Sequence, residues 1–466
     1  MAMTLGIISC GQNSKVEDRN ASTQNPIMPI IYAGDTLSIY LTDYLPQVED
    51  WNTLKFFTEP SYQVVGMENG ILSLIGDYTL SILTVLDDAT GIKYDIPIVP
   101  KNNYEVGLVT KSYTDSTITI GVLNSYEHLQ FRILWQDQRA NEYVEYGQYE
   151  PQATITIEPE WRQSEGRTFI RVYALGDGKN LNDLLIPLEN GKVVNDAAQL
   201  TRHDDQAQIL YSLMIDRFEN GNKKNDWKMN SPEVLDIVDY QGGDIAGITK
   251  KIKDGFFAEL GITTIWISPI TQNPWDAWGM YLFPNGNKYD NTKTYTKFSG
   301  YHGYWPIFAT VVDKRFGTDQ ELQEMLATAH AHNMNVVLDY VANHMHINSP
   351  TLQQNPDWHT DSILPDGRRN FELWDEARLT TWFDVHIPTL DLERAEVCGP
   401  MTDSALFWLD KFAFDGFRHD ACKHIPLNYW RELGRKMKQR YPNRHIWMIG
   451  ETYGNTDLIG SYVKTG

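Results

Sequence analysis

The sequence predicts a multidomain protein, with N-terminal all-β sandwich modules followed by a (β/α)₈ barrel. Three observations support this prediction. Short β-rich runs broken by turn residues fill 26–195, apolar strands alternate with helical patterns after 196, and two of those strands end in carboxylates. Alternation of strand and helix predicts parallel strands, whose carboxyl ends meet on one face of a barrel. We therefore expect a functional site on that face.

The first 25 residues are predicted to be a signal remnant and tether. Residues 1–10 are apolar and end in Ser9-Cys10 before Gly11, as the end of a bacterial lipoprotein signal does. The basic region expected before such a signal does not occur, so coincidence is the alternative. With a lipid on Cys10, the polar run 12–24 would be a flexible tether. The protein would then lie in a bacterial cell envelope, as an outer-membrane lipoprotein, or be secreted.

Composition narrows the classes of function. Forty Lys and Arg against 61 Asp and Glu give a net charge of −21, which disfavours nucleic acid and anionic membrane surfaces as partners. A neutral glycan is indifferent to this charge, and an aromatic fraction of 12% offers flat faces for sugar rings. Membrane contact is expected only through an anchor at Cys10. Cys398 and Cys422 are expected to be buried thiols, because three cysteines are too few for a disulfide framework.

Two β-sandwich modules are predicted, at 26–101 and 102–195, with a linker at 100–103. Alternating runs and turn pairs such as Asn69-Gly70 are typical of short antiparallel strands. The predicted strands are 36–41, 63–65, 71–75 and 78–85 in the first module, and 116–122, 129–135, 153–157 and 169–174 in the second. Trp135 and Trp161 could be glycan platforms, but aromatic residues also fill cores, and we favour packing.

Residues 196–466 are predicted to be a partial barrel. The expected strands are 207–215, 261–269, 334–339, 415–420 and 444–452, with helices at 248–260, 319–331 and 402–412. Their nearly continuous apolar character is typical of strands buried on both faces. Two insertions, at 271–299 and about 345–397, should wall a cleft.

Two strand ends carry carboxylates with opposed environments. Arg418 and Asp420 are two residues apart on a predicted strand, so their side chains point to one side. A neighbouring guanidinium favours the ionised carboxylate that a nucleophile needs. Glu451 follows an apolar run that should partly bury it and favour the protonated form of a general acid. Such a pair is what glycoside hydrolysis requires, and a solvated ion cluster is the alternative.

Oxygen-bearing side chains crowd a loop after the first barrel strand. Asn220, Asn222, Asn225 and Asp226 fall within seven residues, a spacing that suits Ca²⁺ with its six to eight hard ligands. The alternative is a polar turn in which Asn and Asp bond backbone groups.

Three segments together resemble the first signature regions of the α-amylase family, glycoside hydrolase family 13. They are 337–344, 416–424 and 449–452, and their order and spacing also match. The resemblance implies hydrolysis of starch, maltodextrins or related α-glucans. It implies that Asp420 is the nucleophile, Glu451 the general acid/base, Arg418 the group that orients Asp420, His344 a ligand of the sugar at the cleavage subsite, and Lys423 and His424 parts of the adjoining subsite.

The resemblance also implies further binding residues. Segment 301–305 is similar to the family's aromatic platform, in which Tyr304 stacks on the sugar beside His302 and Trp305; a core aromatic is the alternative for Tyr304. Relatives such as neopullulanases and cyclodextrin glucanotransferases complete the calcium loop with a later Gly-Gly-Asp, which implies Gly242 and Asp244 here. A second family calcium site would use Asn343, although Thr389 stands where its Asp partner is expected.

Five barrel strands are predicted rather than eight. The family's fourth signature, a His-Asp pair on the seventh strand, would lie beyond them, so we expect a longer parent amylase. The expected activity is retaining hydrolysis of α-1,4-glucosidic bonds. The alternatives are a catalytically incomplete starch-binding lipoprotein and, within the enzyme class, a neopullulanase- or cyclomaltodextrinase-like activity.

Overall fold

The computed structural model describes residues 5–11 and most of 30–462. Several short loops of 30–200 lie outside the description, as do residues 203, 205–206, 285–292, 442–443, 456–457, 460–461 and 463–466. The predicted tether and residues 101–103 of the predicted linker also lie outside it. Cys10 falls in a strand whose side chains are not described. The lipid anchor therefore stays a prediction.

The chain divides into two compact units. The β-module unit comprises Cys10–Leu200 and Arg435–His445, and the parallel-sheet unit comprises Met1–Ser9, Thr201–Gly434 and Ile446–Gly466. Each is described by itself.

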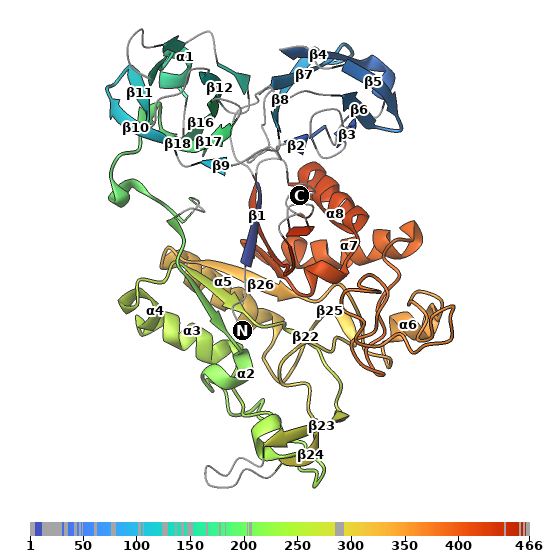
Figure 1. The fold of residues 1–466 in the computed structure, drawn as a ribbon. Helices are drawn as coiled ribbons and strands as arrows, with labels where there is room; N and C mark the ends of the chain where they lie inside the picture. Colours follow the sequence, from blue (N-terminus) through green and yellow to red (C-terminus); the bar gives the residue numbers. More distant parts are fainter. Residues whose placement is uncertain are drawn as a thin grey trace. The chain divides into compact units, whose positions relative to one another are not determined.

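The first module of the β-module unit contains two antiparallel sheets (Figure 1). One pairs β3 (Thr36–Tyr40), β6 (Ile71–Ile75) and β5 (Gln63–Glu68); the other orders β2 (Ile30–Ile31), β8 (Ile92–Pro100), β7 (Ser81–Asp87) and β4 (Leu54–Glu59), with β2 parallel to β8. Leu72 and Leu74 alternate into a core with Leu83 and Val85. Neither β4 nor β8 is among the predicted strands, because lysines and acidic residues interrupt their apolar pattern.

The second module has the same architecture around a core of its own. One of its sheets orders β10 (Leu108–Tyr113), β11 (Thr117–Val122), β15 (Gln152–Thr156) and β14 (Val144–Tyr146). The other orders β13 (Gln138–Arg139), β12 (Leu129–Trp135), β16 (Arg167–Gly176), β17 (Lys179–Leu181) and β9 (Tyr104–Glu105). In this second sheet β18 (Leu184–Glu189) also pairs with β16, and β19 (Lys192–Val193) pairs with β18. Trp161, in α1 (Pro159–Arg162), is 3% exposed in the core, and Trp135 stacks on it with ring centroids 5.3 Å apart. The packing interpretation of this pair is confirmed.

The parallel-sheet unit is built on five of the predicted strands. They are β20 (Leu210–Leu213), β21 (Thr264–Ile267), β26 (Asn335–Tyr340), β27 (Gly416–His419) and β28 (His445–Glu451), each parallel to the next, and β1 (Leu5–Gly11) follows β28 at the far edge. Every residue of β21, β26 and β27 is buried, as expected for strands covered on both faces. The described strands form an open sheet, and closure into an eight-stranded barrel stays a prediction.

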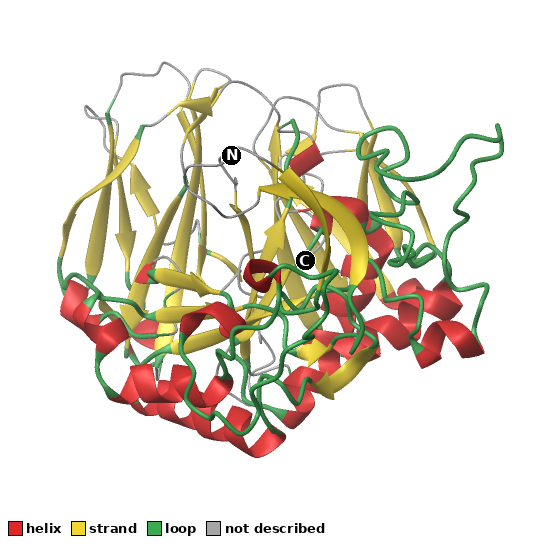
Figure 2. Ribbon diagram, turned by 90° about the horizontal axis from the view of Figure 1, so that it is seen from below, coloured by secondary structure: helices red, strands yellow, loops and turns green. Residues whose placement is uncertain are grey.

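Helices alternate with these strands along the chain, and Figure 2 draws the helices in red. They are α2 (Ile215–Phe218), α3 (Ile245–Lys253), α4 (Phe256–Glu259), α5 (Asp319–Ala331), α7 (Ala395–Lys411) and α8 (Leu427–Arg440). Helix α5 spans the predicted residues, and Thr318 and Glu321 form its capping box. Helix α7 begins at Ala395 rather than Thr402, since the buried face that starts at Val397 continues past Pro400.

The two insertions differ in structure. The first contains β22 (Thr271–Gln272), which pairs with β25 (Phe308–Val312), and a hairpin of β23 (Trp278–Pro284) and β24 (Lys293–Phe298) that stands out from the unit (Figure 1). The second holds α6 (Pro350–Gln354) and isolated bridges, and it ends where α7 begins.

Both cysteines outside β1 are free and buried, as predicted. Among the described residues, none of the helices combines the length and the apolar character needed to cross a bilayer.

Candidate active site

One guanidinium gathers three carboxylates at the carboxyl ends of β26, β27 and β28. Arg418 Nη1 lies 2.8 Å from Asp339 Oδ1 and 3.2 Å from Asp420 Oδ1, and Nη2 lies 2.7 Å from Glu451 Oε2. The side chains of Arg418, Asp339, Asp420 and Glu451 are 3%, 0%, 14% and 27% exposed. The structure thus brings the three predicted catalytic residues together. The two exposed carboxylates are those that a ligand could reach.

Asp339 is the member that the sequence analysis missed. Besides Arg418, its carboxylate accepts hydrogen bonds from Trp266 Nε1 at 3.0 Å and from the Tyr304 hydroxyl at 2.8 Å. The register of the sheet places Asp339 directly opposite Arg418 on the neighbouring strand. The signal in the sequence was an acidic residue inside an otherwise apolar strand.

Burial shifts the protonation of this cluster. It raises the pKa of Asp420, with the charges of Asp339 and Glu451 adding to the rise and Arg418 opposing it. Burial also raises the pKa of Asp339, opposed by its hydrogen-bond donors. The Arg418 charge offsets only part of the rise in the pKa of Asp420. The expectation that Arg418 alone keeps Asp420 ionised is therefore wrong for the free site.

The turn after Asp420 positions Glu451. Ala421 adopts φ 50°, in the left-handed region that a non-glycine residue rarely occupies. Its N–H donates to Glu451 Oε2 at 3.2 Å. A strained backbone residue thus links the two strand ends.

The predicted subsite residues surround this cluster. His344 is buried and its Nε2 lies 3.0 Å from the Tyr304 carbonyl oxygen. Tyr304 bonds Asp339 through its hydroxyl, so it is part of the site rather than of a remote core. His302 Nδ1 accepts the Tyr304 N–H at 3.0 Å. Trp305 is 6% exposed, and its ring centroid lies 4.6 Å from that of His386, so Trp305 packs against the second insertion.

Lys423 and His424 lie in the 3₁₀ turn η7 (Cys422–His424) after Asp420. Both are buried, and both contact the second insertion. Lys423 Nζ is 2.5 Å from Asp375 Oδ1, and His424 Nδ1 donates to the Arg378 carbonyl oxygen at 2.8 Å. The insertion therefore borders the predicted subsite, as expected, through residues that no motif indicated.

The predicted calcium loop leaves buried oxygen atoms without partners. Asn220 Oδ1 and Asn225 Oδ1 have no hydrogen bond, although both atoms are buried. Asp226 Oδ1 accepts Asn220 Nδ2 at 2.7 Å, and a Cβ at Gly242 would lie 2.9 Å from that Asp226 atom. Two unpaired buried oxygens lie near a carboxylate, and the absence of a side chain at Gly242 leaves space beside them. This arrangement fits a hard cation.

Other predicted ligands of this loop are already bonded. Asp244 caps α3 by accepting the Gly247 N–H at 2.6 Å, and it also accepts the N–H groups of Gly221 and Asn222. The Asn222 side chain donates to Glu321 Oε1 at 3.0 Å. Among the described residues, no group of three or more His, Cys, Asp or Glu side chains could hold a metal, so a cation here would depend on amide oxygens.

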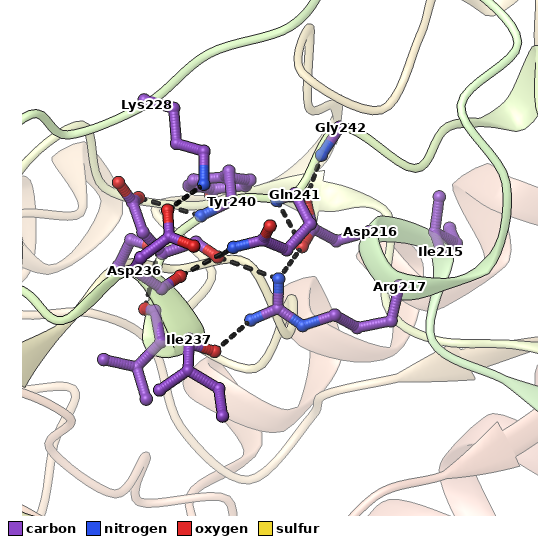
Figure 3. A network of polar contacts seen from close by, with 12 residues as sticks. Ile215, Asp216, Arg217, Lys228, Asp236, Ile237, Tyr240, Gln241 and Gly242 are labelled. Carbon is purple, nitrogen blue, oxygen red and sulfur yellow. Dashed lines mark hydrogen bonds and ion pairs between the residues drawn. The ribbon is translucent and has the colours of Figure 1, made fainter. Parts of the chain in front are cut away.

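A polar network fixes the strand end that precedes this loop (Figure 3). Asp216 accepts the N–H groups of Gln241 and Gly242, and burial raises its pKa to about 6. Arg217 donates to Asp216 and to the Ile237 carbonyl oxygen. The Arg217 guanidinium also lies 3.8 Å from the centroid of the Tyr301 ring. The network thus connects the calcium loop to segment 301–305.

Asn343 lies where the resemblance placed it, beside Thr389. Its Nδ2 is 3.4 Å from Thr389 Oγ1, and its buried Oδ1 has no partner. No carboxylate stands at Thr389, so the second calcium site stays a prediction with one amide ligand.

Parts of the chain are similar to known proteins. The family model described as "Alpha amylase, catalytic domain" matches residues 212–465. Cyclomaltodextrin glucanotransferase of Bacillus sp. (strain 1-1) is 27% identical over 266 residues, which are 53% of this chain and 34% of that protein. Alpha-amylase of Streptomyces lividans is 25% identical over 344 residues, 60% of this chain and 35% of that protein.

Among solved structures, alpha-amylase from Geobacillus thermoleovorans, complexed with acarbose, is 29% identical with a TM-score of 0.40, covering 53% of this chain and 47% of that one. The chain spans about a third of the length of the curated relatives it matches.

Proposed function

Since this chain belongs to the α-amylase family, we propose that it hydrolyses α-1,4-glucosidic bonds of an α-glucan with retention of configuration. The observation that carries the proposal is the shared guanidinium: Arg418 holds Asp420 and Glu451, from adjacent parallel strands, within reach of each other. Retention is what the family resemblance implies, and it requires the two carboxyl groups to lie about 5–5.5 Å apart.

The mechanism gives the two carboxyl groups the roles that the family resemblance implies. Glu451, the more exposed carboxyl, gives its proton to the glycosidic oxygen as the bond to the anomeric carbon breaks. Asp420 attacks that carbon from the opposite side and forms a glycosyl ester. Glu451, now a base, takes a proton from water, whose oxygen attacks the anomeric carbon and releases Asp420.

Neighbouring residues hold this geometry. Asp339 and Arg418 form a buried ion pair that fixes the guanidinium before a sugar binds. Tyr304 and His344 would border the sugar at the cleavage site. Asn220, Asn225 and Asp226 would hold Ca²⁺, whose charge would stabilise the loop that connects β20 to α3.

The test is release of reducing sugar from soluble starch by this chain, with calcium supplied. We expect activity in the wild type and a loss of at least about a thousandfold in Asp420→Asn, because removing the nucleophile removes the covalent pathway. The first product should be the α-anomer, measured by NMR within seconds of mixing. A wild type that binds starch without cleaving it would replace this proposal with a glucan-binding function, and a β-anomeric product would exclude retention.

A further inference from the structure

Residues 374–378 of the second insertion lie against the turn that follows Asp420. The Arg378 guanidinium donates to the Lys423 carbonyl oxygen at 2.8 Å and lies 2.7 Å from the Tyr462 hydroxyl. The Arg378 carbonyl oxygen accepts a hydrogen bond from Nδ1 of His424, and the centroids of the Trp374 and His424 rings lie 5.6 Å apart. Several contacts therefore fix this segment on the turn.

One of these contacts joins a buried cation to an exposed anion. Lys423 Nζ lies 2.5 Å from Asp375 Oδ1, and the two side chains are 2% and 89% exposed. The ammonium also lies 4.0 Å from the centroid of the Tyr453 ring. The buried ammonium therefore fixes the positions of Asp375 and Tyr453 relative to each other. Lys423 is held between a carboxylate and an aromatic face.

The position of this group identifies the side of the cleavage site that it serves. Tyr453 follows Glu451 by two residues and is 50% exposed. In the proposed mechanism Glu451 protonates the oxygen of the departing sugar, so groups beside Glu451 face that sugar rather than the one attacked by Asp420. Tyr453 offers it a flat ring, and the exposed Asp375 carboxylate, fixed by Lys423, offers a hydrogen-bond acceptor.

The family resemblance already assigns Lys423 to the subsite beside the cleavage site. We propose that Asp375 is a further specificity-determining residue for the departing part of the α-glucan, because it holds the Lys423 ammonium over Tyr453 and completes a clamp with them on the leaving-group side. This inference rests on the proposed function. Asp375 acts through Lys423 and is a positioning residue, with its exposed carboxylate also placed to accept a sugar hydroxyl. Asp375→Asn keeps the shape but removes the charge that fixes Lys423.

The experiment compares a substrate that has sugar on the leaving-group side with one that has none there. When maltopentaose is cleaved, the first leaving group is a sugar fragment, which would occupy the clamp. When α-maltosyl fluoride is cleaved, the first leaving group is fluoride, and the clamp stays empty in that step. In Asp375→Asn we expect the ratio of kcat/KM for maltopentaose to kcat/KM for the fluoride to fall about fivefold, mainly through KM, which corresponds to about 1 kcal/mol, the net contribution of a typical hydrogen bond. The matched control is Glu376→Gln, the next residue, whose carboxylate pairs with exposed Arg368.

A double-mutant cycle separates the clamp from a general structural role. Lys423→Met should lower the same ratio, and Asp375→Asn should lower it no further in the Lys423→Met background. An unchanged ratio in Asp375→Asn, or an equal fall in Glu376→Gln, would overturn the inference.

The same variants decide the inference if the chain cleaves neither substrate, in which case the proposed function fails. Titration of maltohexaose by calorimetry then replaces the rates. Binding that weakens about fivefold in Asp375→Asn but not in Glu376→Gln supports the clamp, and equal affinities, or no binding by the wild type, exclude it.

Discussion

At the scale of single residues, the unusual feature is that one buried arginine serves three carboxylates. Asp339 takes two of the contacts to Arg418 Nη1, and Asp420 takes a longer one. The Asp339 charge therefore does two things. It anchors the guanidinium, and it raises the pKa of Asp420 through like-charge repulsion.

Replacing Asp339 by Asn should separate these two effects. With the repulsion removed, the pKa of Asp420 falls, and the acid limb of the activity profile moves to lower pH. The maximal rate should fall as well, by about ten- to a hundredfold, because Arg418 loses its anchor. The measurement is the rate at which an activated 5-fluoroglycosyl fluoride labels Asp420, followed by mass spectrometry from pH 4 to 8. A uniform loss of labelling at every pH would show that Asp339 is only structural.

At the scale of elements, the loop between β20 and α3 is where we propose that calcium binds. Both side-chain polar atoms of Asn225 are buried without partners, and such atoms cost about 1–3 kcal/mol each. The loop is tied to α5 through Asn222 and Glu321, the residue of the capping box. Order in the loop should therefore extend to the start of that helix.

We expect calcium to raise the thermal midpoint of the chain, and Asn225→Leu to abolish that rise. A ligand at a hundred times its Kd stabilises by about 2.7 kcal/mol, whereas the leucine variant has no oxygen to offer and no orphan atom to satisfy. Calorimetry with calcium and with a chelator measures both midpoints, with exposed Lys223→Ala as the control. If calcium still raised the thermal midpoint of Asn225→Leu, the calcium ion would bind at another place.

Sequence patterns predicted the elements of the parallel-sheet unit better than their contacts. Helix α5 was predictable residue by residue because its cap and its apolar spacing are local. Arg418, Asp420 and Glu451 were predictable because strand ends of known order must meet. Asp375 was not, since its partner is 48 residues away and joined by a segment without regular structure.

At the scale of the whole molecule, buried histidines set the response to acid. Burial lowers the pKa of His302, His346 and His419 to about 3 and that of His344 and His424 to about 4. Such groups stay neutral in the fold but bind protons when unfolded below about pH 6.5, so stability is lost as the pH falls through that value. Asp216, Asp339 and Asp420 have raised pKa values and act in the opposite direction. Carboxylates with lowered pKa values, such as Asp384 and Asp415, add to the loss of stability in acid, so we expect a net loss.

His419 allows this balance to be tested at one position. It lies among Phe417, Tyr340 and Trp430, and neither ring nitrogen has a hydrogen bond. At pH 7.5, His419→Leu should unfold at nearly the same urea concentration as the wild type. Between pH 6 and 5, its free energy of unfolding should rise relative to that of the wild type by about 1.4 kcal/mol per pH unit. Exposed His332→Leu is the control. Parallel urea midpoints for wild type and His419→Leu across this range would contradict the assignment.

The stacked indoles of Trp135 and Trp161 give the β-module unit an optical signature of its own. Two indoles 5.3 Å apart and inclined by 15° couple their electronic transitions, so circular dichroism should carry an exciton band from this pair. The band would disappear when the second module melts, whatever the parallel-sheet unit does. A chain of two units that need not unfold together thus contains a built-in reporter for one of them.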